Sequence, residues 1–144
     1  MQVLTRTKNG LCAVVELARN QKEGPVTVRV IAENQGIPVK YLEQLMSLLR
    51  SAGLVRSIRG AKGGYTLVRD PREIKISDVF YSLEGPYATL ECVVDDQFCD
   101  RTENCVAREM WVRVEESIRA TLGDYSVQDL ADSPGSLGPA NYQI

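Results

Sequence analysis

Two short helical patterns joined by a tight turn, over residues 27–52, constrain the fold of this chain more than any other feature. Thr27 is a suitable N-cap for the first pattern, and QGIP at residues 35–38 reads as a helix C-cap followed by a new helix start. Apolar residues recur in both patterns. They are Val30, Ile31 and Ala32 in the first and Leu42, Leu45, Met46 and Leu49 in the second. A helix, a glycine turn and a second helix predict a helix-turn-helix unit.

The outward face of the second helix, expected over residues 39–52, is polar. Its side chains can reach base edges and phosphates in a DNA major groove. They are Lys40, Tyr41, Glu43, Gln44, Ser47 and Arg50. Glu43 is of special interest, because a carboxylate can accept from cytosine N4 but is repelled by phosphates. A plain αα-hairpin with a solvated polar face is the alternative that these residues alone leave open.

A β-hairpin is predicted directly after these helices. Residues 54–59 alternate apolar and polar, residues 60–64 read GAKGG, and residues 65–68 alternate again. Arg59 and Lys62 lie at the tip, where glycines allow a close approach to a duplex and Arg59 could enter a narrow minor groove. A helix-turn-helix followed by such a hairpin is a winged helix, which we expect to bind DNA. A winged helix that binds protein or lipid is the alternative.

The charge of the chain is unevenly distributed. Residues 1–80 carry 13 Lys and Arg against 7 Asp and Glu, a net charge of +6, whereas residues 81–144 carry 4 against 12, a net charge of −8. A basic segment attracts phosphate backbones, and an acidic segment is repelled by them. We therefore expect the N-terminal part to face DNA and the C-terminal part to face away.

An amphipathic helix is expected ahead of Gly24 and Pro25, which end it. Its apolar stripe is Leu4, Leu11, Val14, Val15 and Ala18. Cys12 falls about 110° from the centre of that stripe, given roughly 100° per residue in an α-helix. It shares this flank with Lys8 and Arg19, so Cys12 is not an obvious core cysteine.

Three further cysteines, Cys92, Cys99 and Cys105, form the pattern C-x6-C-x5-C in a polar segment that we expect to be a loop. A polar loop of this length usually holds a ligand or is disordered. Thiolates are soft ligands that suit zinc or iron-sulfur clusters. The pattern therefore predicts a metal or cluster site. A disulfide with a leftover thiol, or unconnected structural cysteines, are the alternatives.

Three motifs, YLEQL at 41–45, RGAKGGY at 59–65 and ECVVDDQFCDRTENCVAREMW at 91–111, together resemble the IscR and NsrR regulators. These belong to the Rrf-two family of bacterial winged-helix transcription factors, and the resemblance covers residues 1–133. It implies a homodimeric repressor or dual regulator. An iron-sulfur cluster in such a protein senses iron-sulfur status, redox state, iron or nitric oxide.

The resemblance also implies roles for particular residues. By position, Glu43 and Gln44 match the family's base-reading pair, and Arg59 matches its wing arginine. The three ligand cysteines of the family correspond to Cys92, Cys99 and Cys105. The first gap between these cysteines is one residue longer than the common C-x5-C-x5-C, a change that a loop can absorb.

The chain departs from the family at the fourth cluster ligand. The IscR branch has histidine three residues after the last cysteine, where this chain has Arg108. The NsrR branch takes an acidic residue from the partner's first helix, where this chain has Lys8, and the chain contains no histidine. Cys12 lies one turn after Lys8 on the same flank. We predict that Cys12 of one subunit completes the cluster of the other. The alternative is that Cys12 is a half-buried small residue and that Glu109, a water or a small cellular thiol fills the site.

A long helix is predicted over residues 105–122. Its apolar stripe is Ala107, Trp111, Val114, Ile118 and Leu122. The charged residues opposite or beside the stripe are Arg108, Glu109, Arg113, Glu115, Glu116 and Arg119. We expect Trp111, Val114, Ile118 and Leu122 to form a homodimer interface, with packing on the chain's own winged domain as the alternative. Ser126 is expected to cap a short helix ending at Asp132, with Leu130 facing inward.

The predicted fold is mostly α-helical with a small β-hairpin wing, and 144 residues are enough for one good core. We divide the chain into four parts. They are a winged helix-turn-helix DNA-binding domain at 1–84, a cysteine-rich cluster-binding loop at 85–104, a dimerisation helix and short C-terminal helix at 105–133, and a disordered tail rich in Gly, Pro and Ser at 134–144.

Enzyme and membrane functions are disfavoured. Without histidine, hydrolytic triads are excluded, and RGAKGGY lacks the following helix that a phosphate-binding loop needs. No apolar stretch is long enough to span a membrane and the N-terminus does not resemble a signal peptide, so we expect a cytoplasmic protein. A DNA-binding transcriptional regulator is predicted. A zinc- or thiol-based regulator of the same fold, or a winged-helix protein-interaction module, is the alternative.

Overall fold

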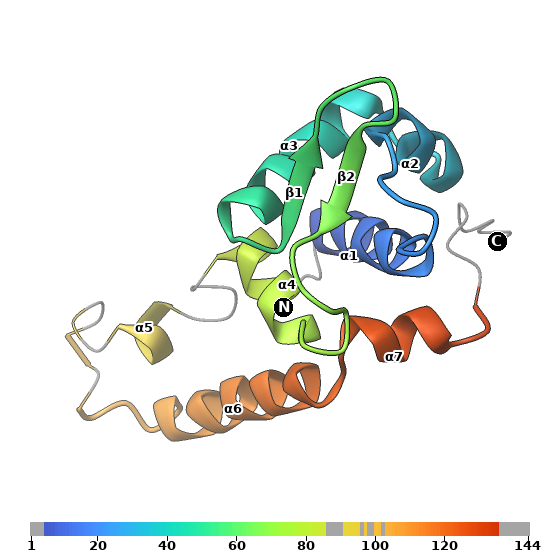
Figure 1. Cartoon of the computed structure of the whole chain (residues 1–144). Coiled ribbons are helices and arrows are strands. Elements are labelled where there is room, and N and C mark those ends of the chain that lie inside the picture. The colour runs from blue at the N-terminus through green and yellow to red at the C-terminus, as the bar shows by residue number, and fades with distance from the viewer. Residues whose placement is uncertain (1–4, 86–90, 96, 98–99, 102, 136–144) are drawn as a thin grey trace, which may run out of the picture.

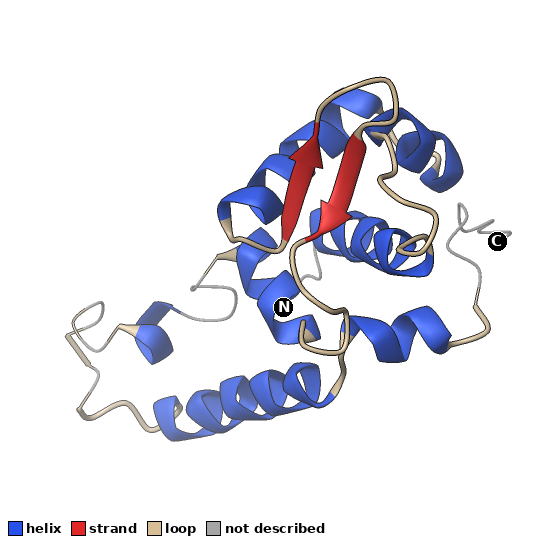
Figure 2. Ribbon diagram, viewed as in Figure 1, coloured by secondary structure: helices blue, strands red, loops and turns tan. Residues whose placement is uncertain are grey.

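The computed structural model describes residues 5–85, 91–95, 97, 100–101 and 103–135. Within these residues the fold is helical with one two-stranded antiparallel sheet, as Figures 1 and 2 show. This confirms the predicted mostly α-helical class with a β-hairpin wing. No helix in this part of the chain is both long and apolar enough to cross a membrane.

The first three helices are α1 (Thr5–Arg19), α2 (Val28–Gln35) and α3 (Val39–Ser51). Thr27 caps α2 as predicted, because its hydroxyl accepts a hydrogen bond of 3.3 Å from the backbone N–H of Val30. Gly36 ends α2 in the left-handed conformation, with φ at 66°, which glycine adopts without strain. The chain then turns through Pro38 into α3.

Apolar side chains from these helices form the centre of the core. The largest of those that are fully buried are Val14, Ile31, Leu42, Met46 and Leu49. Val30 differs from the prediction: its side chain is 43% exposed, because α2 turns Ile31 and Ala32 inward instead. On α1, Glu16 is also buried, and its carboxylate accepts hydrogen bonds from the side-chain amides of Asn34 and Gln35 on α2.

The wing is formed by β1 (Val55–Ile58) and β2 (Gly64–Leu67), paired antiparallel with Val55 opposite Leu67. Val26, just before α2, exchanges backbone hydrogen bonds of 2.8 and 3.0 Å with Tyr65 and so extends the hairpin. Val55 and Leu67 are buried at the base of the hairpin. The wing is thereby anchored to the core, and its tip projects from it (Figure 1).

Helix α4 (Ile76–Glu84) was not predicted from the sequence. Its apolar residues are spaced as an amphipathic helix requires. They are Ile76, Val79, Phe80 and Leu83, all buried. Asp78 stabilises the first turn by accepting a hydrogen bond of 3.1 Å from the backbone N–H of Lys75. Helix α4 packs against α1, α3 and α6.

Part of the predicted cysteine loop is helical, since α5 (Glu91–Val94) forms one turn there. The predicted long helix is confirmed as α6 (Arg108–Asp124), which lies along the lower edge of the molecule in Figure 1. The burial of Glu115 was not predicted. Glu115 belongs to the charged set expected opposite or beside the apolar stripe, but it is buried, where Tyr81 and Arg119 donate hydrogen bonds to its carboxylate.

The short C-terminal helix is α7 (Val127–Asp132). Ser126 caps it as predicted, accepting from the backbone N–H of Asp129 at 3.1 Å, and Leu130 packs against the core. Arg19 of α1 donates to the backbone carbonyls of Ala131, Ser133 and Gly135 at 2.7 to 3.0 Å. Helix α7 therefore packs on α1. The predicted tail from residue 136 onward lies outside the described residues.

Candidate DNA-binding surface and cysteine region

The buried and exposed sides of α3 match the prediction. Leu42, Leu45, Met46 and Leu49 hold one side in the core. The exposed positions on the other side are Lys40, Glu43, Gln44, Ser47 and Arg50. Tyr41 is the exception, because it is half-buried and packs against the core. Five of the six predicted α3 residues thus lie on a solvent-facing surface.

Two apolar side chains on α3 share its solvent-exposed surface and were not singled out from the sequence. Leu48 is 41% exposed and Val39 is 39% exposed. An exposed aliphatic group beside polar readers can contact the methyl group of thymine in the major groove. For Leu48 the sequence signal was present, since it falls outside the helical repeat of the four buried apolar residues, whereas Val39 falls within that repeat and is the first residue of α3.

The tip of the wing presents the predicted basic residues. Arg59 and Lys62 are both exposed. The turn between them requires glycine: Gly60 has φ at 117°, and a side chain on Gly63 would collide with the backbone carbonyl of Ile58. A tight turn of this kind carries two cations with little bulk around them. It can therefore approach a phosphate backbone closely.

The cations of this surface are available for an external anion. Arg56, exposed on β1, adds a positive charge beyond those predicted from the sequence. Within the described part of the chain, no hydrogen bond or ion pair engages the side chains of Lys40, Arg56, Arg59 or Lys62. Unpaired cations on one surface attract nucleic acid by releasing counterions from its phosphates.

Two of the three clustered cysteines lie within the described residues. Cys92 is half-buried on α5, and Cys105 is exposed just before α6. Arg108 donates a hydrogen bond of 3.4 Å from Nε to the backbone carbonyl of Cys92, which draws α5 toward the start of α6. Cys99 is outside the described residues. Among those that are described, no three Cys, Asp or Glu side chains gather closely enough to hold a metal ion.

Cys12 lies apart from these cysteines, on α1 beside α7. It lines a small cavity of about 180 Å³ together with Leu11, Val15 and Leu130, and Arg19 stands at its edge. Burial raises the pKa of the Cys12 thiol, an effect that nearby Lys8 opposes. The position is half-buried, in agreement with the expectation that Cys12 is not a core cysteine.

Part of the apolar stripe of α6 is uncovered. Trp111 is 41% and Val114 38% exposed, and Met110 beside the stripe is 53% exposed, which is high for large apolar side chains on one helix. Val114 and Ile118 also line a groove of about 590 Å³ along this helix. Leu122, at the end of the predicted interface, packs at the edge of the chain's own core instead.

Comparison with known proteins places these features in a family. The family model for Rrf2 (Rrf-two), described as an iron-dependent transcriptional regulator, matches residues 3–133. The transcriptional regulator CymR of Bacillus subtilis is 39% identical over 131 residues, which is 91% of this chain and 90% of CymR. The transcriptional regulator IscR of Xenorhabdus nematophila is 33% identical over 99% of this chain and 87% of IscR.

Solved structures agree with the sequence matches. The IscR structure from T. potens superimposes with a TM-score of 0.74 at 39% identity, covering 90% of this chain and 85% of that one. The B. subtilis CymR structure, described as that of the global cysteine regulator, has a TM-score of 0.74 at 37% identity. The match covers 91% of this chain and 96% of that one.

Proposed function

The chain belongs to the Rrf2 family of transcriptional regulators, and from this we propose that it is a homodimeric DNA-binding repressor with an iron-sulfur cluster. The relatives are named as regulators, which confirms the expectation that the chain is not an enzyme. One observation carries the DNA-binding part of the proposal. The polar face of α3 and the basic tip of the wing are both exposed, and their cations have no partners in the described residues.

In this proposal the winged domain, residues 1–84, reads DNA with two elements. Helix α3 enters the major groove, where Lys40, Tyr41, Glu43, Gln44, Ser47 and Arg50 approach bases and phosphates. Arg59 and Lys62 grip an adjacent minor groove or its phosphates. Glu43 discriminates between sites more than it adds affinity, because its carboxylate is repelled by the backbone.

The dimer is proposed to form along α6, within the dimerisation segment 105–133. The exposed apolar stripe and the groove beside Val114 and Ile118 support a second copy of α6 as the occupant. A two-fold axis there would present two α3 helices to a symmetric operator. Half-site centres would then lie about one helical turn apart, or a multiple of it.

The cluster is proposed to bind in the segment 85–104 and at its border with α6. Three thiolates are soft donors that suit iron and sulfide, and Cys92, Cys99 and Cys105 would hold the group. Such a cluster supplies redox chemistry and reactivity toward iron, oxidants or nitric oxide. The fourth ligand is proposed to be Cys12 of the partner subunit.

A cysteine-responsive or thiol-based regulator without a cluster is the second candidate. It is favoured by the similarity to CymR, which is described as a global cysteine regulator. In that case Cys92 and Cys105 would act as free thiols or bind zinc. The two candidates share the DNA-binding surface. They differ in whether the cysteine region holds an iron-sulfur cluster, or has free thiols or zinc.

Anaerobic purification followed by ultraviolet-visible spectroscopy, with iron, sulfide and zinc analysis, separates the candidates. A cluster predicts visible absorption and stoichiometric iron, whereas the second candidate predicts a colourless protein. DNA binding is measured separately by titrating an operator selected from a random library at several salt concentrations. If the protein bound no duplex in a salt-sensitive way, the proposed DNA-binding function would be contradicted, and a winged-helix protein-interaction module would be favoured.

A further inference from the structure

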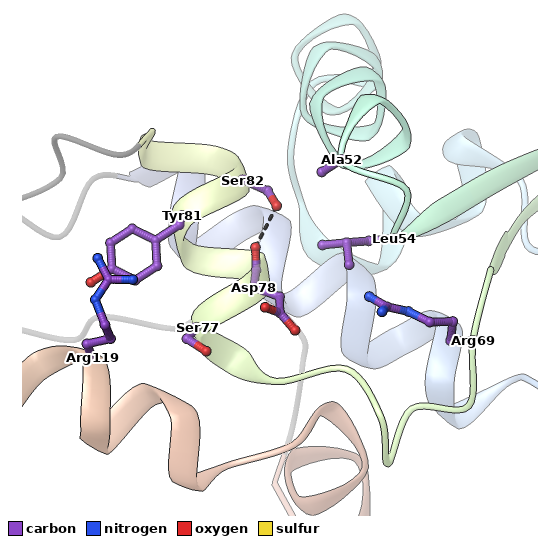
Figure 3. Close-up of a pocket in the computed structure, with 8 residues that line it drawn as sticks. All are labelled: Ala52, Leu54, Arg69, Ser77, Asp78, Tyr81, Ser82 and Arg119. Carbon is purple, nitrogen blue, oxygen red and sulfur yellow. Dashed lines mark hydrogen bonds between the residues drawn. The ribbon is translucent and has the colours of Figure 1, made fainter.

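A cleft of about 470 Å³ lies where the winged domain meets α6 (Figure 3). Its walls come from the turn between α3 and β1, the loop that follows β2, helix α4 and helix α6. Its volume is in the range of small-molecule sites. None of the residues proposed above to contact DNA or a cluster lines it, so the proposed function leaves its contents unexplained.

Two opposite charges face this cleft without pairing. In Figure 3, Arg69 extends from its loop toward Asp78 on α4. Within the described residues, Arg69 makes no hydrogen bond or ion pair. Asp78 accepts only the backbone N–H of Lys75, at 3.1 Å, and has no cationic partner. A ligand between the two side chains would therefore meet one free guanidinium and one carboxylate.

The remainder of the cleft is apolar on one side and carries a fixed cation at its far end. Leu54 lines this apolar side and is only 2% exposed, so its side chain is held in place by the core. On α6, Arg119 donates to Glu115 at 3.1 Å and lies 4.3 Å above the centre of the Tyr81 ring. Both contacts hold this second guanidinium in place, next to half-buried Tyr81.

We propose that the cleft binds a free amino acid in its zwitterionic form. The carboxylate of the ligand pairs with Arg69, its ammonium group pairs with Asp78, and its aliphatic part lies against Leu54. Simple anions fit less well because Asp78 repels them, and simple amines are repelled by Arg69. Charge-assisted hydrogen bonds to the two ends of the ligand make Arg69 and Asp78 together selective for molecules that carry both a carboxylate and an ammonium group.

Because the walls belong to both the winged domain and α6, an occupied cleft would favour the arrangement of the two that is described here. Amino-acid binding in the cleft requires neither the cluster nor DNA. The cleft can therefore be empty in a protein that has the proposed function, or occupied in one that lacks it.

The test is a nuclear magnetic resonance titration of the full-length protein with glycine, β-alanine and 4-aminobutyrate, which differ in the spacing of the two charges. Acetate, methylamine and inorganic phosphate serve as single-charge probes. With at least one amino acid, we expect saturable shifts of resonances from α4 and from the loop that follows β2. The affinity for that amino acid should be at least about tenfold higher than the affinity for each single-charge probe.

Variants then identify the two contacts. Arg69→Gln and Asp78→Asn are each expected to weaken binding about tenfold, and the asparagine keeps an oxygen to accept from Lys75. Arg72→Gln is a matched control, because Arg72 lies in the same loop but pairs with Asp70 at 2.7 Å. Asp129→Asn is the second control, since Asp129 accepts from the Ser126 backbone N–H at 2.8 Å in the same capping role on α7.

Three outcomes overturn the proposal. The first is the absence of saturable binding by all three amino acids. The second is phosphate, acetate or methylamine binding as tightly as the best amino acid, which would make the cleft a simple ion site. The third is an equal loss of binding in the control variants, which would indicate a structural effect and not contact with the ligand.

Discussion

Tyr81 on α4 and Glu115 on α6 are joined by a hydrogen bond of 2.8 Å, in which the phenol hydroxyl donates to the carboxylate. Glu115 is only 7% exposed, and Arg119 donates to the same oxygen at 3.1 Å. A buried carboxylate is stable only when its oxygens are satisfied. This contact therefore fixes α6 against the winged domain at one polar point.

Replacing Tyr81 with phenylalanine is expected to lower the free energy of unfolding by about 1–3 kcal/mol, because the buried Glu115 loses one donor. Urea unfolding followed by circular dichroism measures the change. Tyr125→Phe is the matched control, since Tyr125 is 51% exposed and should shift stability by no more than about 0.5 kcal/mol. Equal stability of the two variants would show that the bond contributes nothing.

The same pair predicts a dependence of stability on alkaline pH. Burial, and then the hydrogen bond to Glu115, raise the pKa of Tyr81 above its ordinary value. The stabilisation is therefore fully present below about pH 10, the value for an unfolded tyrosine, and is lost as the pH rises through the folded value. The free energy of unfolding of the Tyr81→Phe variant should decline less steeply than that of the parent as the pH rises through that window. Parallel unfolding curves for parent and variant would contradict the shift.

The helix-turn-helix and the wing were predictable from sequence because their signals are local. Thr27 and Gly36 mark the ends of α2, and the burial of α3 follows its apolar spacing. Helix α4 could also have been found, since Ile76, Val79, Phe80 and Leu83 follow the same rule. A continuous apolar repeat is sufficient for such elements.

The polar contacts between helices were not predictable in the same way. Glu115 bonds to a residue 34 positions earlier, and Glu16 is buried by amides from α2, 18 and 19 positions later. A charged residue in an amphipathic pattern is assigned to the exposed side unless its partner is known. Position along the chain does not identify that partner, so the burial of Glu16 and Glu115 emerges only from the packed fold.

Two substitutions test the DNA-binding surface. Glu43→Ala should broaden the set of operators bound, with discrimination at one base pair falling by about 1–3 kcal/mol. Arg59→Ala should weaken all sites and reduce the slope of log affinity against log salt by about 1. Binding to a selected and a scrambled duplex, measured by fluorescence anisotropy at several salt concentrations, separates the two effects.

Arg72→Ala is the control for these measurements. Arg72 is exposed but is paired with Asp70, and it lies outside α3 and the wing. It should change neither the affinity nor its salt dependence. If both Glu43→Ala and Arg59→Ala also left the affinity and the range of operators intact, α3 and the wing would not be the reading surface.

The dimer interface is tested by a charge on α6. Ile118→Asp should give a monomer by sedimentation and a much weaker affinity for a two-fold operator, because a buried unpaired carboxylate is costly at an apolar interface. Ala120→Asp adds the same charge at an exposed position outside the groove and should remain dimeric. A dimer that survives a double substitution of Val114 and Ile118 by aspartate would rule out this interface.

The Cys12 thiol should react slowly in the cluster-free protein. Burial raises its pKa, so less thiolate is present at neutral pH than at an exposed cysteine. Cys105 is exposed and should be alkylated first by iodoacetamide, as mapped by mass spectrometry over time. Faster modification of Cys12 than of Cys105 would mean that α1 and α7 separate readily at this cavity.

The ligand role of Cys12 is the more demanding prediction. Cys12 lines a cavity together with Leu130 of its own chain, so its thiol must both leave that cavity and lose its proton before it can bind iron in the partner subunit. Iron binding favours the thiolate strongly enough to oppose the effect of burial. Cys12→Ser, purified anaerobically, should show altered charge-transfer bands and faster cluster loss. Its cluster-free form should unfold at a urea concentration close to that of the parent, which separates lost ligation from damaged packing. A spectrum and a decay rate identical to those of the parent would exclude Cys12 as the fourth ligand.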